Sequence, residues 1–116
     1  MKVKRIVANI AASNPADAKV FYQSVFGLEL VMDHGWIKTF SSEEKMIAQV
    51  SIASEGGSGT PVPALSIEVD DLEAVLQTVK AKHIPIEYGP VAEPWGVRRF
   101  YIRDPFGTLI NVLQHQ

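Results

Sequence analysis

The two halves of this 116-residue chain repeat one order of predicted secondary-structure elements. Alternating apolar and polar residues predict strands at residues 3–11 and 64–69, and each strand is followed by a segment with apolar residues at helical spacing. Shorter strand patterns follow each helix, so both halves read β-α-β-β-β, which indicates an internal duplication. Because neither half alone could cover its sheet, we expect an α+β fold in which two such modules pair, within the chain or with a second subunit.

The predicted modules are residues 1–54 and 63–116 of a single domain, joined by a glycine- and serine-rich segment at residues 55–62. Segments of this composition are typical of flexible linkers. In the first module we expect a helix that begins after Asn14 as N-cap and ends at Gly27, with an apolar stripe buried against the sheet. The fourth strand of that module is predicted at residues 46–53.

In the second module, Asp70 and Glu73 have the spacing of a capping box and predict the start of its helix. A strand at residues 97–103, a turn at residues 104–107 and a strand at residues 108–113 complete the module.

Composition excludes several functional classes. A formal net charge of −2, with no block of Lys and Arg, argues against a nucleic-acid or membrane partner. The absence of cysteine excludes disulfides and thiol-based zinc sites. The first residues lead into a strand pattern and not into the apolar core of a signal peptide, so we expect a cytoplasmic protein.

Residues 93–111 hold most of the side chains that could do chemistry. Three of the four arginines lie there, together with Tyr101 and Trp95. Guanidinium groups match carboxylate and phosphate, and tryptophan can stack on a flat ligand. Both residue types also occur on solvated sheet faces and in interfaces, so an anion site and an ordinary surface stay open as alternatives. We interpret this segment as a candidate small-molecule face.

Residues 21–28, 67–72 and 104–111 read FYQSVFGL, IEVDDL and DPFGTLIN, in this order within the duplicated pattern. With these motifs the whole chain resembles the vicinal oxygen chelate superfamily, which includes glyoxalase I, bleomycin-resistance proteins and extradiol dioxygenases. The resemblance implies a homodimer of paired modules and a curved mixed sheet that forms a ligand cleft.

In metal-dependent members of this superfamily, His, Glu or Gln side chains hold a divalent ion. The corresponding positions fall near Val7, Gln49, Ala64 and Asn111. Valine and alanine have no donor atom, and the two amides lack the charge that a hard cation prefers. We therefore predict no metal cofactor, although a divalent metal held by an atypical set stays open.

The polar residues left at the cleft are the candidate site. The resemblance implies that Tyr101 matches an active-site tyrosine. If Val7 and Ala64 face the cleft, as it also implies, alternation places four further polar residues there: Arg5, Asn9, Ser66 and Glu68. A carboxyl group in a partly apolar cleft can have a raised pKa and act as a general base, or Glu68 can form an ion pair with an arginine such as Arg99. The remaining ligand-binding candidates are Trp36, Gln49, Trp95 and Asn111.

Two functions follow from this reading. The first is a metal-free protein of the bleomycin-resistance type that binds an aromatic or anionic small molecule. The second is an enzyme of the glyoxalase or dioxygenase kind, a lyase, isomerase or oxidoreductase, with an atypical metal set or with acid–base catalysis by Glu68 and Tyr101. A shared scaffold hosts all of these activities, so the residues of the site have to decide between them.

Overall fold

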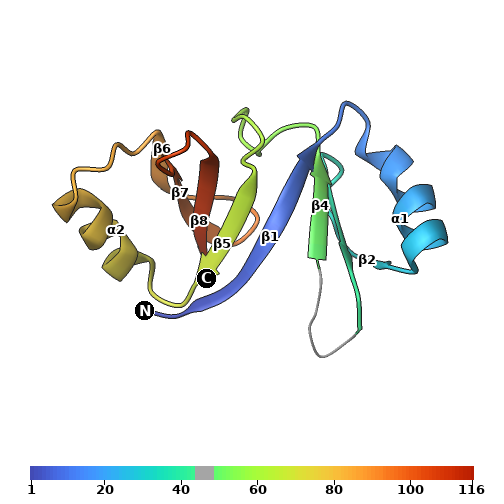
Figure 1. Cartoon of the computed structure of the whole chain (residues 1–116), viewed down its shortest axis with the longest axis horizontal. Coiled ribbons are helices and arrows are strands. Elements are labelled where there is room, and N and C mark those ends of the chain that lie inside the picture. The colour runs from blue at the N-terminus through green and yellow to red at the C-terminus, as the bar shows by residue number, and fades with distance from the viewer. Residues whose placement is uncertain (44–48) are drawn as a thin grey trace. The chain divides into compact units, whose positions relative to one another are not determined.

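A computed structural model of the chain describes residues 1–43 and 49–116 (Figure 1). Its elements are β1 (Val3–Ala11), the short 3-10 helix η1 (Pro15–Asp17), α1 (Ala18–Phe26), β2 (Glu29–Asp33), β3 (Ile37–Ser41), β4 (Gln49–Ala53), β5 (Leu65–Val69), α2 (Leu72–Ala81), β6 (Tyr88–Ala92), β7 (Val97–Arg103) and β8 (Leu109–His115). This order confirms the α+β fold and the repeated β-α-β-β-β pattern. Of the strand predicted at residues 46–53, residues 46–48 lie outside the described part.

The chain divides into two compact units, Val7–Val62 and Met1–Ile6 with Pro63–Gln116. The strand order is β2-β3-β4-β1 in the first unit and β5-β8-β7-β6 in the second, and β1 runs from one unit into the other. β1 pairs with β4, and β5 with β8, in parallel, whereas the neighbours β2–β3, β3–β4, β6–β7 and β7–β8 are antiparallel. Each unit thus has a mixed sheet, and the predicted module limits and linker stay predictions.

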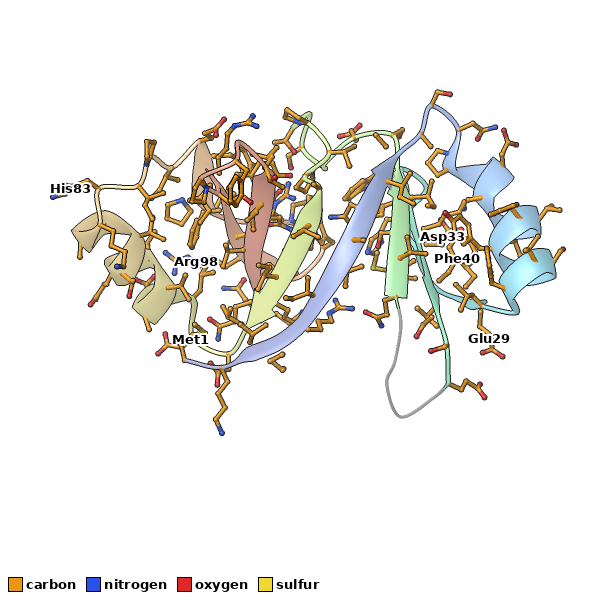
Figure 2. All side chains as sticks on the ribbon, viewed as in Figure 1. Met1, Glu29, Asp33, Phe40, His83 and Arg98 are labelled. Carbon is orange, nitrogen blue, oxygen red and sulfur yellow. The ribbon has the colours of Figure 1, made fainter. Side chains whose placement is uncertain are left out.

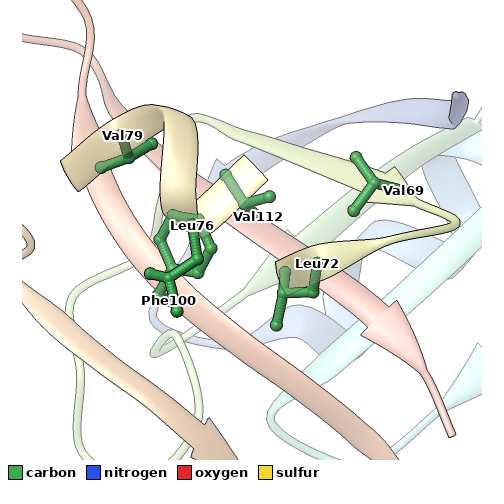
Figure 3. Close-up of a cluster of buried hydrophobic side chains, with 6 residues drawn as sticks. All are labelled: Val69, Leu72, Leu76, Val79, Phe100 and Val112. Atoms are coloured by element: carbon green, nitrogen blue, oxygen red, sulfur yellow. The ribbon is translucent and has the colours of Figure 1, made fainter. Parts of the chain in front are cut away.

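Helix α2 covers one face of the β5-β8-β7-β6 sheet (Figure 3). The buried side chains between them are Val69, Leu72, Leu76, Val79, Phe100 and Val112. The predicted N-cap of this helix is wrong by one residue, because Asp71 accepts the hydrogen bond from the Ala74 amide. Asp70 instead accepts a bond from the amide of Lys2 and so holds the start of β1 beside β5.

The opposite face of the same sheet carries polar side chains between the buried apolar residues Val97, Leu109 and Leu113. Strand alternation places Ser66 and Glu68 of β5, Asn111 and His115 of β8, and Arg99 and Tyr101 of β7 on that side. We call these six residues the polar face. Four of them, Glu68, Arg99, Tyr101 and Asn111, are buried. Because burial of polar groups is costly unless they are paired, their partners decide what this face can do.

Helix α1 differs from the prediction. None of its residues is buried, and Phe21, Val25 and Phe26 are more than half exposed. The apolar side of this helix is therefore not buried against the sheet as predicted. Its packing contact with the sheet is Tyr22, which stacks on the fully buried ring of Phe40 on β3, labelled in Figure 2.

The start of α1 differs from the prediction, and its end agrees with it. Asn14 makes no side-chain cap, and residues 15–17 form the 3-10 helix before α1 begins. Gly27 takes the predicted left-handed conformation and ends the helix.

Two loops are closed by hydrogen bonds of their own. In the turn between β7 and β8, Asp104 accepts hydrogen bonds from the amides of Phe106 and Thr108, which confirms the predicted turn. The glycine-rich segment forms a loop closed by Gly56 and Thr60, whose backbone groups bond at 2.7 Å. Among the described residues, no helix is long and apolar enough to cross a membrane.

Candidate ligand-binding site

Ser66, Asn111 and Tyr101 form one row across β5, β8 and β7. They are direct register partners, and Asn111 lies in the middle. Its Nδ2 donates a hydrogen bond to Ser66 Oγ at 3.1 Å, whereas its Oδ1 is buried and has no hydrogen-bond partner. A buried acceptor without a partner costs about 1–3 kcal/mol, so it marks a position where a missing donor would be stabilising.

Arg99 lies beside this row and is held by a buried carboxylate. Its Nε and Nη2 contact Glu93 Oε2 at 2.9 and 2.6 Å, and its Nη1 donates to the Tyr101 hydroxyl at 2.9 Å. Both side chains of the ion pair are only 3% exposed. The hydroxyl of Tyr88 donates to the same carboxylate at 3.2 Å. The positive charge of Arg99 is therefore balanced inside the protein.

Three aromatic rings surround the Arg99 guanidinium. Its central carbon lies 5.3 Å from the ring centroid of Tyr88 and 5.0 Å from those of Trp95 and Tyr101. These distances are typical of cation–π contacts. Trp95, at the turn before β7, is partly exposed. The cluster places an aromatic surface next to the row that contains Asn111.

Glu68 pairs with the start of β1. Its carboxylate lies 2.5 Å from Arg5 Nε, 3.1 Å from His115 Nδ1 and 3.6 Å from Lys4 Nζ. The predicted alternative of an ion pair with an arginine is therefore observed, but the partner is Arg5, because Arg99 binds Glu93. Arg5 reaches Glu68 because the beginning of β1 runs beside β5.

This pairing also decides the ionisation of Glu68. Burial by itself would raise the pKa of Glu68, but the hydrogen bond and the charge of Arg5, followed by those of His115, hold it below its usual value. The raised pKa expected of a general base is therefore wrong for this residue. At neutral pH Glu68 is an ion-paired carboxylate.

Two of the predicted ligand-binding residues lie in the other unit. Gln49 opens β4 and pairs in register with Ser41. Trp36 precedes β3, and its ring stacks on that of His34 at 6.3 Å between centroids. On β3 and β4 of that unit, Thr39 and Ser51 form a buried pair whose hydroxyls are 2.7 Å apart.

The sequence patterns assigned no role to Tyr88 and did not predict the pair of Glu93 and Arg99. Glu93 is buried and lies six positions before Arg99, on the other side of a tight turn. The Glu93 amide donates a hydrogen bond to the Val97 carbonyl across this turn, and this brings the two side chains together. His115 was not placed beside Glu68, although two-residue alternation from Asn111 puts it on the polar face.

The positions of the superfamily's metal ligands do not fit a divalent ion here. Val7 has only a buried apolar side chain, and Ala64 has a methyl group, so neither has a donor atom. Asn111 could offer its Oδ1, but an amide oxygen carries no charge for a hard cation. Within residues 1–43 and 49–116, no three His, Cys, Asp or Glu side chains lie close enough together to hold a metal. We therefore derive no chemical step through a metal ion.

The comparisons with known proteins place this geometry in a family. The model of the Glyoxalase/Bleomycin resistance protein/Dioxygenase superfamily matches residues 3–112. A chain described as an NAD-dependent benzaldehyde dehydrogenase from Legionella pneumophila superposes with a TM-score of 0.76 at 16% identity, over 97% of this chain and 100% of that one.

Two further solved structures share the fold. A variant of methylmalonyl-CoA epimerase from Streptomyces coelicolor, in complex with 2-nitronate-propionyl-CoA, superposes with a TM-score of 0.73 at 14% identity, over 98% of this chain and 96% of that one. A superfamily member from Vibrio splendidus superposes with a TM-score of 0.67 at 17% identity, over 99% of this chain and 100% of that one. At these identities the structures show a common fold, and together with the family match they establish that this chain belongs to the Glyoxalase/Bleomycin resistance protein/Dioxygenase superfamily.

Proposed function

We propose that the chain is a small-molecule binding protein that takes an aromatic ligand on its polar face without a metal ion. The observation that carries the proposal is the buried, unpartnered Oδ1 of Asn111. A ligand hydroxyl or N–H group supplies the missing donor. Of the rings around Arg99, those of Tyr88 and Trp95 are partly exposed and offer an aromatic ligand a surface, while the buried ring of Tyr101 connects them to the row of Asn111.

The residues at the site favour an aromatic ligand over an anionic one. Arg99, the cation nearest the row of Ser66, Asn111 and Tyr101, already has Glu93 as its counter-ion. A ligand carboxylate would have to compete with a buried pair, and separating such a pair leaves a buried charge unpaired. A homodimer and a cytoplasmic location, both expected from the sequence, belong to this proposal.

An enzyme is the second candidate, and one contact favours it. Arg99 donates a hydrogen bond to the Tyr101 hydroxyl, which would stabilise negative charge that develops on this oxygen when the phenol gives up its proton. Such an enzyme would use Tyr101 as its acid. Glu68 is the weaker of the two proposed catalytic residues, because its ion pair with Arg5 makes it a poor base.

Phenol is a suitable probe, because it combines an aromatic ring with one hydroxyl. We expect chelator-treated protein to bind phenol saturably, with amide chemical shifts that change at β5, β7 and β8 in a ¹⁵N-labelled sample. Asn111→Leu should remove this binding without changing the rest of the spectrum. The matched control is Thr39→Val, which alters a buried hydroxyl on the other sheet and should leave phenol binding unchanged.

Three outcomes would contradict the proposal. Binding that requires added Ni²⁺, Zn²⁺ or Mn²⁺ would overturn the metal-free reading. Phenol binding that survives Asn111→Leu would remove Asn111 from the site. Turnover of superfamily-type substrates that is lost in Tyr101→Phe, with the fold intact, would support the enzyme instead.

A further inference from the structure

A second hollow lies on the α1 side of the β2-β3-β4-β1 sheet. It has a volume of about 390 Å³, within the range of roughly 300–1,000 Å³ that small-molecule sites occupy. Its lining comes from the end of β1, the segment that follows, the first turns of α1 and the middle of β4. All its lining residues lie in the unit Val7–Val62, whereas the polar face described above belongs to the other unit.

The hollow exists because α1 contacts its sheet at few points. Tyr22 stacks on Phe40 with ring centroids 5.6 Å apart, while Phe21 packs edge-on against Tyr22 at 5.2 Å and stays half exposed. The side chains of Ile10 and Ile52 form the apolar part of the lining below these rings. A ligand with an apolar body would therefore contact aliphatic side chains on one side and aromatic rings on the other.

The same hollow contains one acid, Asp17, in the turn that leads into α1. Its carboxylate makes no hydrogen bond or ion pair to any residue that the structure describes, whereas the carboxylates of Glu68 and Glu93 are both paired with arginine. None of the lining residues in the described part of the chain is Lys or Arg. The other polar lining side chains, Ser13 and Asn14, add neutral hydrogen-bonding groups.

An uncompensated carboxylate beside aromatic rings is the chemistry that recognises an ammonium group. The carboxylate supplies a charge-assisted hydrogen bond, and the faces of Phe21 and Tyr22 can add a cation–π contribution. We infer that this hollow binds a small organic amine whose apolar body lies against Ile10 and Ile52 and whose ammonium group pairs with Asp17.

Benzylamine, which is a cation at neutral pH, tests the inference against benzyl alcohol, its neutral analogue of similar size. In ¹⁵N-labelled protein, we expect benzylamine to change the amide shifts of residues 10–22 and to bind about tenfold more tightly than benzyl alcohol. Asp17→Asn should weaken benzylamine about tenfold and leave benzyl alcohol unchanged. Glu29→Gln removes the same charge from the exposed strand β2 and should change neither affinity.

A second variant covers the apolar part of the site. Ala18→Phe places a ring in the hollow and should abolish the shifts that both probes cause at residues 10–22, while the amide spectrum of residues 63–116 without a probe stays that of the parent protein. The inference is overturned if no saturable shift occurs up to the solubility of benzylamine, if benzyl alcohol binds equally well, or if Asp17→Asn and Glu29→Gln weaken benzylamine alike. None of these results bears on phenol binding at the polar face.

Discussion

Replacing Asn111 by leucine tests whether its buried oxygen is truly without a partner. Leucine has the same number of side-chain heavy atoms with the same branching, so the change removes polarity and keeps the shape. The loss of the Nδ2 bond to Ser66 costs about 0.5–1.5 kcal/mol, while removal of the unpaired Oδ1 returns about 1–3 kcal/mol. The net change in the free energy of unfolding lies between a loss of about 0.5 and a gain of about 2.5 kcal/mol, so we expect the variant to be about as stable as the parent protein or more stable.

This expectation does not depend on which way the amide points. If the group is turned over, Oδ1 accepts from Ser66 and Nδ2 becomes the unpaired atom, since one hydroxyl contacts the amide. Leucine removes the cost in both cases. The stability prediction therefore concerns one unsatisfied polar atom at Asn111, whereas the ligand donor of the proposed function requires that this atom is Oδ1.

Urea unfolding, followed by circular dichroism, measures the difference. Thr39→Val provides the contrast, because Thr39 bonds Ser51 at 2.7 Å and its loss leaves a buried hydroxyl unpaired. That variant should be destabilised by about 1–3 kcal/mol. If Asn111→Leu is destabilised by a similar amount, Oδ1 has a partner in the folded protein, and the reasoning that places a ligand donor there fails.

Further predictions concern the charges and one glycine. Arg99→Met should destabilise the fold by about 3–5 kcal/mol in urea unfolding because it leaves Glu93 buried and unpaired, and the double variant with Glu93→Leu should recover much of this loss. The pKa of Glu68 is lower in the folded than in the unfolded protein, so the stabilisation from its ion pair is present above the ordinary pKa of 4.5 and is lost as the pH falls through the pKa of the folded state. Glu68→Gln should therefore flatten the pH dependence of the free energy of unfolding below about 4.5. An unchanged slope would contradict the pairing. In Gly89→Ala the new Cβ would lie 2.5 Å from the backbone oxygen of Arg99, so thermal unfolding should show a larger loss than in Gly107→Ala, where nothing lies within 4 Å and only backbone strain of about 1–3 kcal/mol applies.

The elements that the sequence predicts best are those with a strong local signal. β7 has the predicted limits, residues 97–103, because its alternation is uninterrupted and Gly96 and Asp104 bound it. Gly27 ends α1 as expected, since a left-handed residue is needed there. By contrast, apolar residues at helical spacing predict which side chains lie on one side of a helix, but they do not predict how closely that side packs against the sheet. The exposed Phe21 of α1 is the result of that difference.

The site was harder to predict because its partners are distant in sequence. Arg5 and Glu68 are 63 positions apart, and their contact depends on how β1 lies beside β5, which residue patterns alone do not specify. The Arg99 contact with Glu93 is only six positions apart and follows from the hairpin of β6 and β7. A local pair on facing ends of a turn was therefore within reach of the sequence, and the long-range pair was not.

The arginines lead to the last prediction, on ligand charge. Each of the four has a glutamate partner: Arg5 with Glu68, Arg98 with Glu73, Arg99 with Glu93 and Arg103 with Glu87. The polar face thus offers an incoming anion no arginine without a counter-ion.

Phenol can donate and accept a hydrogen bond, whereas benzoate can only accept and carries a charge that a buried site must compensate. We expect phenol to bind more tightly than benzoate in calorimetric titrations at neutral pH. In Glu93→Gln the difference between the two affinities should be smaller, because this variant removes the carboxylate that neutralises Arg99. Tighter benzoate binding in the parent protein would mean that a ligand carboxylate displaces Glu93. The buried pair would then be an anion site held closed by an internal carboxylate.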